Sequence, residues 1–301
     1  MGYDIKLALD AKAQLGETPI WHPEKGVLYW TDGFAGEFRV YDPETGKDKT
    51  YQVGDLIGSA IPCTDGRVLL LLDTGLALFD FADESVTHIL DVEPGDDANR
   101  LNDGRCDARG RLWFSTVSKL FGTEAYQPEM TGALYMVDTD MTLYTKMIGI
   151  KQLNGIGWSA DNTRMHVVDT YNFKLYRFGY DIETGGVSAP QTAVEIPESL
   201  GYADGMCVDA DDNVWIAHWA GKVSKWNPES GELLETVEMP VPNITCPGFG
   251  GEGFDTLYIT TSKFGISEQD LLTMPLGTSG GLFALKPGVK GRESYLFSPA
   301  D

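Results

Sequence analysis

The chain consists of short apolar runs, rich in β-branched and aromatic residues, that are separated by polar turns containing Asp, Gly, Asn or Pro. Six segments share one pattern, in which a polar turn is followed at once by an apolar run. They are residues 21–32, 62–73, 106–116, 158–169, 208–218 and 249–260, and their starts lie 41 to 52 residues apart. A turn between two short apolar runs predicts a β-hairpin in each segment.

Repeats of forty to fifty residues with about four short strands each are typical of propeller blades. We therefore predict an all-β fold, a six-bladed β-propeller with about four antiparallel strands per blade, formed by residues 1–301 as a single domain. To close the ring, we expect residues 4–9 to join a sheet made by residues 281–285 and 293–297. A short helical period occurs near residues 267–272.

The repeat alignment places one residue of each blade at the start of its innermost strand. Equivalent positions in a propeller form a ring around the central axis, so these six residues should meet at one mouth of the channel. They are Glu17, Gly58, Asn102, Asn154, Asp204 and Thr245. Polar side chains near the axis are costly unless they are paired or coordinate a ligand. Carboxylate and amide oxygens favour a hard cation such as Ca²⁺, Mg²⁺ or Mn²⁺ over zinc.

Turn formation is the competing interpretation of this ring. Asn and Asp before Gly are common turn formers. Asn154 and Asp204 lie directly before a glycine, and Asn102 begins the turn-like segment Asn102-Asp103-Gly104. Glu17 is followed by Thr18 and a proline, so it has no such role. Four polar residues in one register therefore indicate a metal site better than they indicate four unrelated turns.

Composition adds a constraint through charge. The 301 residues include 45 Asp and Glu but only 23 Lys and Arg, which gives a formal net charge of −22. Such an acidic chain is a poor partner for nucleic acid or for an anionic membrane surface. The first residues resemble no targeting segment, no apolar run is long enough to span a bilayer, and the four cysteines lack a zinc or redox spacing. We expect a cytoplasmic protein with free thiols.

Several segments together resemble the SMP-30/gluconolactonase/regucalcin-like family. They recur in order, about one per blade, across essentially the whole chain: residues 15–21, 100–107, 154–159, 204–209, 255–261 and 280–284. The resemblance implies a six-bladed propeller with one divalent metal ion and hydrolysis of a sugar lactone to the aldonic acid. Calcium is the expected ion, with zinc, manganese and magnesium left open.

The resemblance also implies roles for individual residues. Glu17, Asn154 and Asp204 match metal-binding positions, Asp204 also matches the general base, and Arg100 and Asn102 match substrate-binding positions. A Lewis-acidic metal and an Arg are suited to the negative charge that develops on a lactone carbonyl oxygen. A carboxylate is suited to taking a proton from the attacking water.

The segment after residue 116 departs from the family pattern. A Glu that helps to hold the substrate in some members has no clear counterpart here, and Glu124 cannot be given that role. Lys119, Tyr126 and His218 with Trp219 are weaker candidates for the pocket, each with an ordinary surface or core role as the alternative. Another hydrolase activity on the same site, such as a phosphotriesterase or arylesterase, stays open, as does a non-catalytic calcium-binding propeller. The sugar, the lactone ring size and the oligomeric state are not determined by the sequence.

Overall fold

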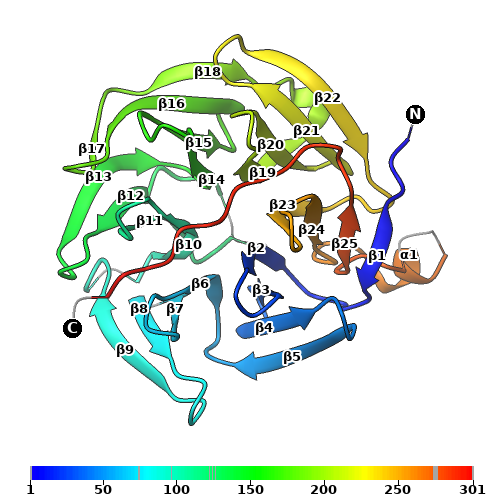
Figure 1. Cartoon of the computed structure of the whole chain (residues 1–301), viewed down its shortest axis with the longest axis horizontal. Helices are drawn as coiled ribbons and strands as arrows, with labels where there is room; N and C mark the ends of the chain where they lie inside the picture. The colour runs from blue at the N-terminus through cyan, green and yellow to red at the C-terminus, as the bar shows by residue number, and fades with distance from the viewer. Residues whose placement is uncertain are drawn as a thin grey trace.

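Six antiparallel sheets surround a central axis in the computed structural model of the chain, as predicted (Figure 1). The structure describes residues 2–73, 75–95, 97–121, 123, 125, 127–273 and 277–299. Each sheet is one blade of a β-propeller, and its strands are hydrogen-bonded in sequence order from the axis outward. The sixth blade is the exception, because its outermost strand comes from the amino-terminal end of the chain.

The first three blades follow the predicted hairpin pattern closely. From the axis outward they contain β2 (Gly16–His22), β3 (Val27–Asp32), β4 (Glu37–Asp42) and β5 (Lys47–Gln52); β6 (Ile57–Pro62), β7 (Val68–Leu72), β8 (Gly75–Phe79) and β9 (Val86–Asp91); and β10 (Asn99–Cys106), β11 (Leu112–Ser118), β12 (Gly132–Val137) and β13 (Leu143–Ile150).

The last three blades contain one additional strand and the two short helices. They are β14 (Leu153–Trp158), β15 (Arg164–Asp169), β16 (Lys174–Asp181), β17 (Gly186–Val187) and β18 (Gln191–Glu195); β19 (Tyr202–Val208), β20 (Val214–Trp219), β21 (Lys222–Asn227) and β22 (Glu232–Glu238); and β23 (Ile244–Gly250), β24 (Thr256–Thr261), β25 (Leu282–Leu285) and β1 (Lys6–Leu9). A 3₁₀ turn, η1 (Glu198–Leu200), precedes β19, and α1 (Glu268–Thr273) lies at the predicted helical position. Among the described residues, no helix has the length and apolar character needed to cross a bilayer.

The ring is closed by the amino-terminal strand, as the sequence predicts. β1 pairs antiparallel with β25, where Lys6 is opposite Ala284 and Leu9 is opposite Leu282. The hydroxyl of Tyr41 in the first blade donates a hydrogen bond of 3.1 Å to the carbonyl of Ala8, which ties β1 to the neighbouring blade. The amino-terminal strand thus completes the sixth blade and joins it to the first.

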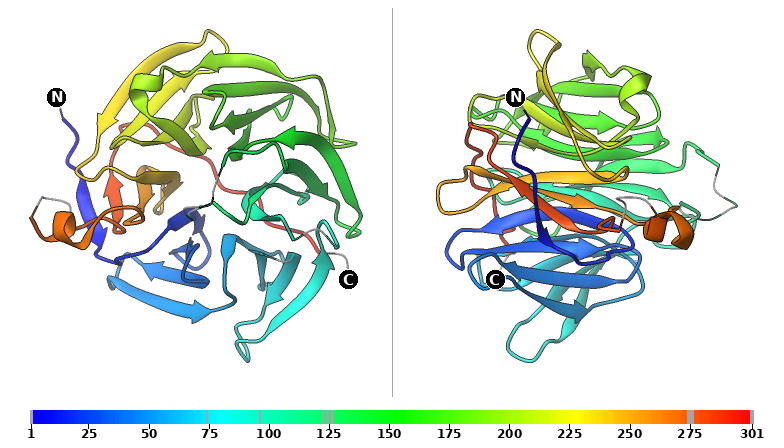
Figure 2. Two further views of the ribbon diagram at one scale, coloured as in Figure 1. Left: turned by 180° about the vertical axis from the view of Figure 1, so that it is seen from behind. Right: turned by 90° about the vertical axis from the view of Figure 1, so that its right-hand side faces the viewer.

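The expectation that residues 293–297 extend this sheet is wrong. β1 already occupies the free edge of β25, and the carboxy-terminal segment instead crosses one face of the ring (Figures 1 and 2). Gly291 bridges to Asp209 in the fifth blade and Phe297 bridges to Cys63 in the second. The Phe297 ring is fully buried in the cluster between the second and third blades, and this apolar burial stabilises the crossing.

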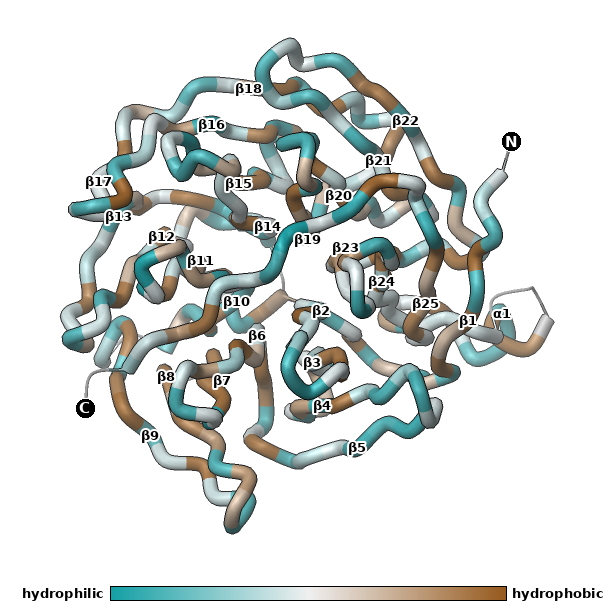
Figure 3. Tube along the Cα trace, viewed as in Figure 1, coloured by the Kyte–Doolittle hydropathy of each residue, from teal (hydrophilic) through white to brown (hydrophobic). Residues whose placement is uncertain are grey.

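Apolar side chains pack between neighbouring blades. The outermost strand β5, in contrast, consists mostly of hydrophilic residues (Figure 3). The third and fifth blades contain the same buried hydrogen bond between an Asp and a Trp. The buried Asp107 accepts a 3.1 Å hydrogen bond from the Trp113 indole, and the buried Asp209 accepts a 3.0 Å hydrogen bond from the Trp215 indole. Each carboxylate also accepts backbone N–H groups of its own turn. The Asp of the repeat therefore joins the turn to the second strand of the blade.

Candidate functional site

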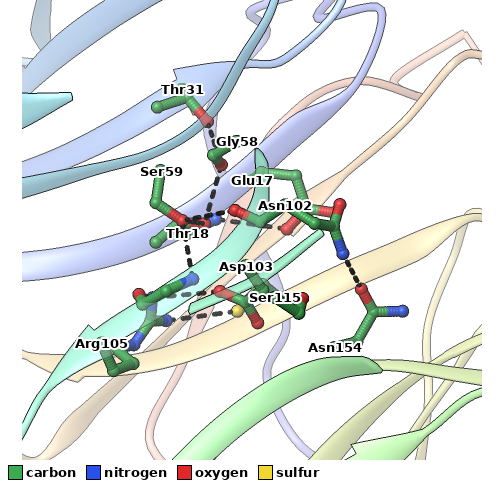
Figure 4. Close-up of polar contacts among 12 residues, drawn as sticks. Glu17, Thr18, Thr31, Gly58, Ser59, Asn102, Asp103, Arg105, Ser115 and Asn154 are labelled. Atoms are coloured by element: carbon green, nitrogen blue, oxygen red, sulfur yellow. Dashed lines mark hydrogen bonds and ion pairs between the residues drawn. The ribbon is translucent and has the colours of Figure 1, made fainter. Parts of the chain in front are cut away.

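The starts of the innermost strands surround a pocket at the mouth opposite the carboxy-terminal crossing. Its lining comes from five of the six blades and contains Leu15, Glu17, Thr18, Ile57, Gly58, Arg100, Asn102, Asp103, Phe121, Gln152, Asn154, Asp204 and Trp219. All five residues singled out in the sequence as metal- or substrate-binding thus lie in one pocket, and three of them are labelled in Figure 4. The cavity measures about 20 Å³, which is room for a cation or a water molecule.

A β-bulge explains why these side chains point inward. In every innermost strand the pairing with the second strand shifts register at the predicted ring position; for example, between Glu17 and Ile20, between Leu101 and Gly104, and between Ala203 and Met206. A bulge bends the strand and redirects the side chains at the irregularity. The repeated bulge therefore places one residue per blade at the channel mouth.

Two ring positions do not contribute polar groups to the pocket. Gly58 lies so close to the third blade that a Cβ atom would overlap the backbone carbonyl of Asn102. The Thr245 hydroxyl is instead bonded to the carbonyl of Gly16, at 2.5 Å, and to the hydroxyl of Thr260, at 2.9 Å. Thr245 therefore joins the sixth blade to the first, and Gly58 allows the second and third blades to approach.

A chain of hydrogen bonds fixes the amides around the pocket. Arg100 Nη1 donates to Asn102 Oδ1 at 3.3 Å. Asn102 Nδ2 in turn donates to Asn154 Oδ1 at 2.7 Å, as Figure 4 shows. Asn154 Nδ2 then donates to the Thr170 hydroxyl at 2.7 Å, and that hydroxyl donates to the carbonyl of Ala203 at 2.8 Å. The chain links the third, fourth and fifth blades and ends next to Asp204, so its side chains are held in fixed orientations.

The carboxylates of the pocket are placed where negative charge is unfavourable. Burial, and next the neighbouring Asp204 and Asp103 carboxylates, raise the pKa of Glu17 well above its usual value. Burial raises the pKa of Asp204 to about 7, although the hydrogen bond from Trp219 lowers it. Desolvation and like charges both disfavour the ionised form. The pocket thus concentrates negative charge that the surrounding residues only partly compensate.

Two further residues at the pocket are better seen in the structure than in the sequence. Asp103 follows Asn102 in the bulge of β10, lines the pocket, and pairs with Arg105 at 3.4 Å. The Trp219 indole donates a 2.6 Å hydrogen bond to Asp204 Oδ2. Trp219 was a weak candidate in the sequence, whereas nothing in the repeat alignment singled out Asp103. The repeat register could have predicted that Leu15 and Gln152 line the pocket, because each lies two residues before a ring position, as Arg100 does.

The remaining weak candidates lie elsewhere. His218 is buried within the fifth blade, where its Nε2 is 2.6 Å from the Ser224 hydroxyl, and it does not line the pocket. Lys119 lines a neighbouring hollow together with Arg100 and Glu93. Glu124 and Tyr126 fall outside the described residues.

The donor groups of the pocket fit a hard divalent cation. Among the described residues, no three Asp, Glu, His or Cys side chains gather as a metal-binding group, so a cation would have to combine carboxylate and amide ligands. Glu17 and Asp204 supply two carboxylates, and Asn154 supplies an amide oxygen. Such oxygen donors suit Ca²⁺, Mg²⁺ and Mn²⁺. A cation would also offset the charge repulsion that raises the Glu17 pKa.

The fold and this site define a class of propeller that comparison with known proteins identifies. The sequence profile of the SMP-30/Gluconolactonase/LRE-like region matches residues 15–263. The chain belongs to this family.

Similar proteins match at least 95% of the chain. The pentonolactonase XacC of Haloferax volcanii is 32% identical over 303 residues, covering 97% of both chains. Regucalcin of Xenopus laevis is 29% identical over 289 residues, covering 95% of this chain and 96% of its own. A crystal structure described as a calcium-binding protein, regucalcin, from Agrobacterium tumefaciens superposes with a TM-score of 0.90 at 25% identity, covering 99% of this chain and 98% of the other.

Proposed function

We propose that the protein hydrolyses a sugar lactone to the aldonic acid with the help of one divalent cation. The observation that carries this proposal is the gathering of Glu17, Arg100, Asn102, Asn154 and Asp204 in one pocket from four different blades. Membership of a family whose relatives include a named pentonolactonase supports the substrate class.

Arg100 and Asn102 would hold the lactone. The Arg100 guanidinium lies 5.8 Å from the centre of the Phe121 ring and donates to Asn102 Oδ1. These two contacts together fix the orientation of the guanidinium plane. Guanidinium N–H groups suit an oxygen on which negative charge develops. We infer that this pair directs the carbonyl end of the lactone into the pocket.

Asp204 would act as the general base. Its Oδ2 accepts the Trp219 N–H, which orients the carboxylate. In the reaction, Asp204 takes a proton from water as the water oxygen bonds to the carbonyl carbon. The ring C–O bond then breaks, and the proton returns to the oxygen that leaves, which gives the open hydroxy acid.

Glu17, Asn154 and Asp204 would hold the cation, which when bound supplies Lewis-acid stabilisation of the carbonyl oxygen. Calcium is the ion we propose, because all three ligands are oxygens and because similar proteins include one described as calcium-binding. The chain's own contribution is to hold these oxygens through the bulges of three innermost strands.

The test is a pH-stat assay of the purified chain on several aldonolactones, aryl esters and organophosphates. Each substrate is measured after removal of metal by a chelator and again after addition of Ca²⁺, Mg²⁺, Mn²⁺ or Zn²⁺. We expect hydrolysis of at least one aldonolactone, loss of that activity with chelator, and recovery with Ca²⁺. The Asp204→Asn variant should lose about a hundredfold or more in kcat, the usual contribution of a positioned base. Asp211→Asn, an exposed residue of the same blade, is the matched control.

Other outcomes distinguish the alternatives. Hydrolysis of aryl esters or organophosphates without lactones would assign the site to a different hydrolase. Calcium binding without turnover of any substrate would indicate a non-catalytic calcium-binding propeller. Full activity of Asp204→Asn would contradict the proposed mechanism.

A further inference from the structure

A second set of equivalent residues lies next to the ring of Glu17, Asn102, Asn154 and Asp204. Leu15, Arg100 and Gln152 each precede a ring residue by two positions, in the first, third and fourth blades respectively, and all three line the pocket. Arg100 is the member that the proposed reaction already uses. Gln152 is its counterpart beside Asn154, and no role described so far requires its side chain.

The Gln152 side chain is buried, and its amide oxygen lacks a hydrogen-bond partner. The residue is 5% exposed, and its Oε1 atom is buried with no hydrogen-bond partner. Its backbone carbonyl, in contrast, accepts the N–H of Thr170 at 3.2 Å, so the backbone just before β14 is paired. A buried amide oxygen without a partner lowers stability. A structural role would not require this amide, because an apolar residue such as Leu15 occupies the equivalent position of the first blade.

The two polar residues of this set offer different chemistry. The Arg100 guanidinium has donors only and therefore suits the carbonyl oxygen, whereas a Gln amide has both a donor and an acceptor. A sugar hydroxyl also both donates and accepts, so it is the group that a Gln amide matches on both counts. The Asn102 and Asn154 amides nearby are engaged with each other.

We propose that Gln152 is a specificity-determining residue, whose amide binds a ring hydroxyl of the substrate and so selects hydroxylated lactones over plain ones. This inference rests on the proposed lactonase function. A lactone without hydroxyls would bury the amide and leave it unpaired, and sites built to hydrogen-bond a hydroxyl discriminate strongly against analogues that lack it.

The test compares two lactones that have the same ring size. One is D-gluconolactone and the other is δ-valerolactone, which lacks the hydroxyl groups. For the wild-type chain and for Gln152→Met, which keeps the length of the side chain but removes the amide, kcat/KM is measured on both. We expect the ratio of gluconolactone to valerolactone activity to fall about tenfold or more in Gln152→Met, mainly through a higher KM for gluconolactone. Gln191→Met, which makes the same change at an exposed glutamine in the outer strand β18 of the same blade, should leave the ratio within about twofold of wild type.

The outcomes separate this inference from the function on which it rests. If the wild-type chain hydrolyses neither lactone nor any other aldonolactone, the proposed function fails. If the wild-type chain hydrolyses gluconolactone but Gln152→Met keeps the wild-type ratio, only the role of Gln152 is overturned. An equal loss on both lactones, with a lowered melting temperature, would show that Gln152 acts through folding and would also overturn its role in specificity.

Discussion

The indole N–H of Trp219 lies 2.6 Å from Oδ2 of Asp204, so the last residue of β20 holds a carboxylate of the neighbouring β19 at the channel mouth. The same type of bond joins Trp215 to Asp209 only a few residues away, at 3.0 Å, but inside the blade and outside the pocket. One chemical interaction therefore occurs twice in the fifth blade, once at the candidate site and once in the core.

This pair provides a matched test of the site. Trp219→Phe removes the hydrogen bond that orients Asp204, and we expect kcat on an aldonolactone to fall about tenfold or more while the melting temperature changes little. Trp215→Phe removes the equivalent bond in the core, leaving the buried Asp209 with one donor fewer. It should lower the free energy of unfolding by about 1–3 kcal/mol with little effect on kcat. Steady-state kinetics and denaturant unfolding of both variants check this, and identical effects would contradict it.

Gly58, at the ring position of the second blade, should affect activity through its neighbour Asn102. In Gly58→Ala the new methyl group would overlap the Asn102 carbonyl, so β6 or β10 has to move. Because Asn102 donates to Asn154 and to the carbonyl of Leu153, the displacement should disturb the pocket and lower kcat/KM about tenfold or more.

Gly157→Ala is the control for this variant. Its methyl group would meet only the ends of the Met206 and Val208 side chains, which can adjust more easily than backbone. Lactonase assays should therefore show near wild-type activity for Gly157→Ala. A larger loss in Gly157→Ala than in Gly58→Ala would contradict the argument.

The buried His166 side chain should make the stability of the protein depend on pH. Burial, and next the positive charges of Arg177, Arg164 and Arg292, lower the pKa of His166 to about 4. In the unfolded chain His takes up a proton near pH 6.5, so between about pH 6.5 and 4 the unfolded state binds more protons than the folded state. This group's contribution to stability is therefore full above pH 6.5 and is lost as the pH falls toward 4.

His166→Gln isolates this effect. Relative to its value at pH 7.5, the free energy of unfolding should fall less on acidification in the variant than in the wild type, by about 3 kcal/mol at pH 4. Urea unfolding at a series of pH values measures the difference between the two curves. Parallel curves would show that His166 does not contribute.

Closure of the ring by β1 predicts a strong effect of truncation. Deletion of residues 1–10 removes the strand paired with β25 and exposes that edge of the sheet. We expect the melting temperature to fall by at least about 5 °C. Lys6→Gln removes only an exposed ion pair with Asp4 while keeping the backbone pairing, and it should melt close to wild type. A change below about 1 °C on truncation would contradict the closure.

Much of this architecture is local in origin and was therefore predictable from the sequence. Alternating apolar and polar residues with turn-forming Asp and Gly predict hairpins, and their spacing predicts the number of blades. The same register identified Glu17, Asn102, Asn154 and Asp204, because equivalent positions of a repeat occupy equivalent positions in space. Only the assembled ring determined that Thr245 turns toward Gly16 and that Trp219 bonds to Asp204. Likewise, the path of residues 293–297 depends on β1 occupying the sheet edge and on the burial of Phe297 between distant blades. These features depend on which surfaces remain free once all six blades have packed, and no local pattern in the chain contains that information.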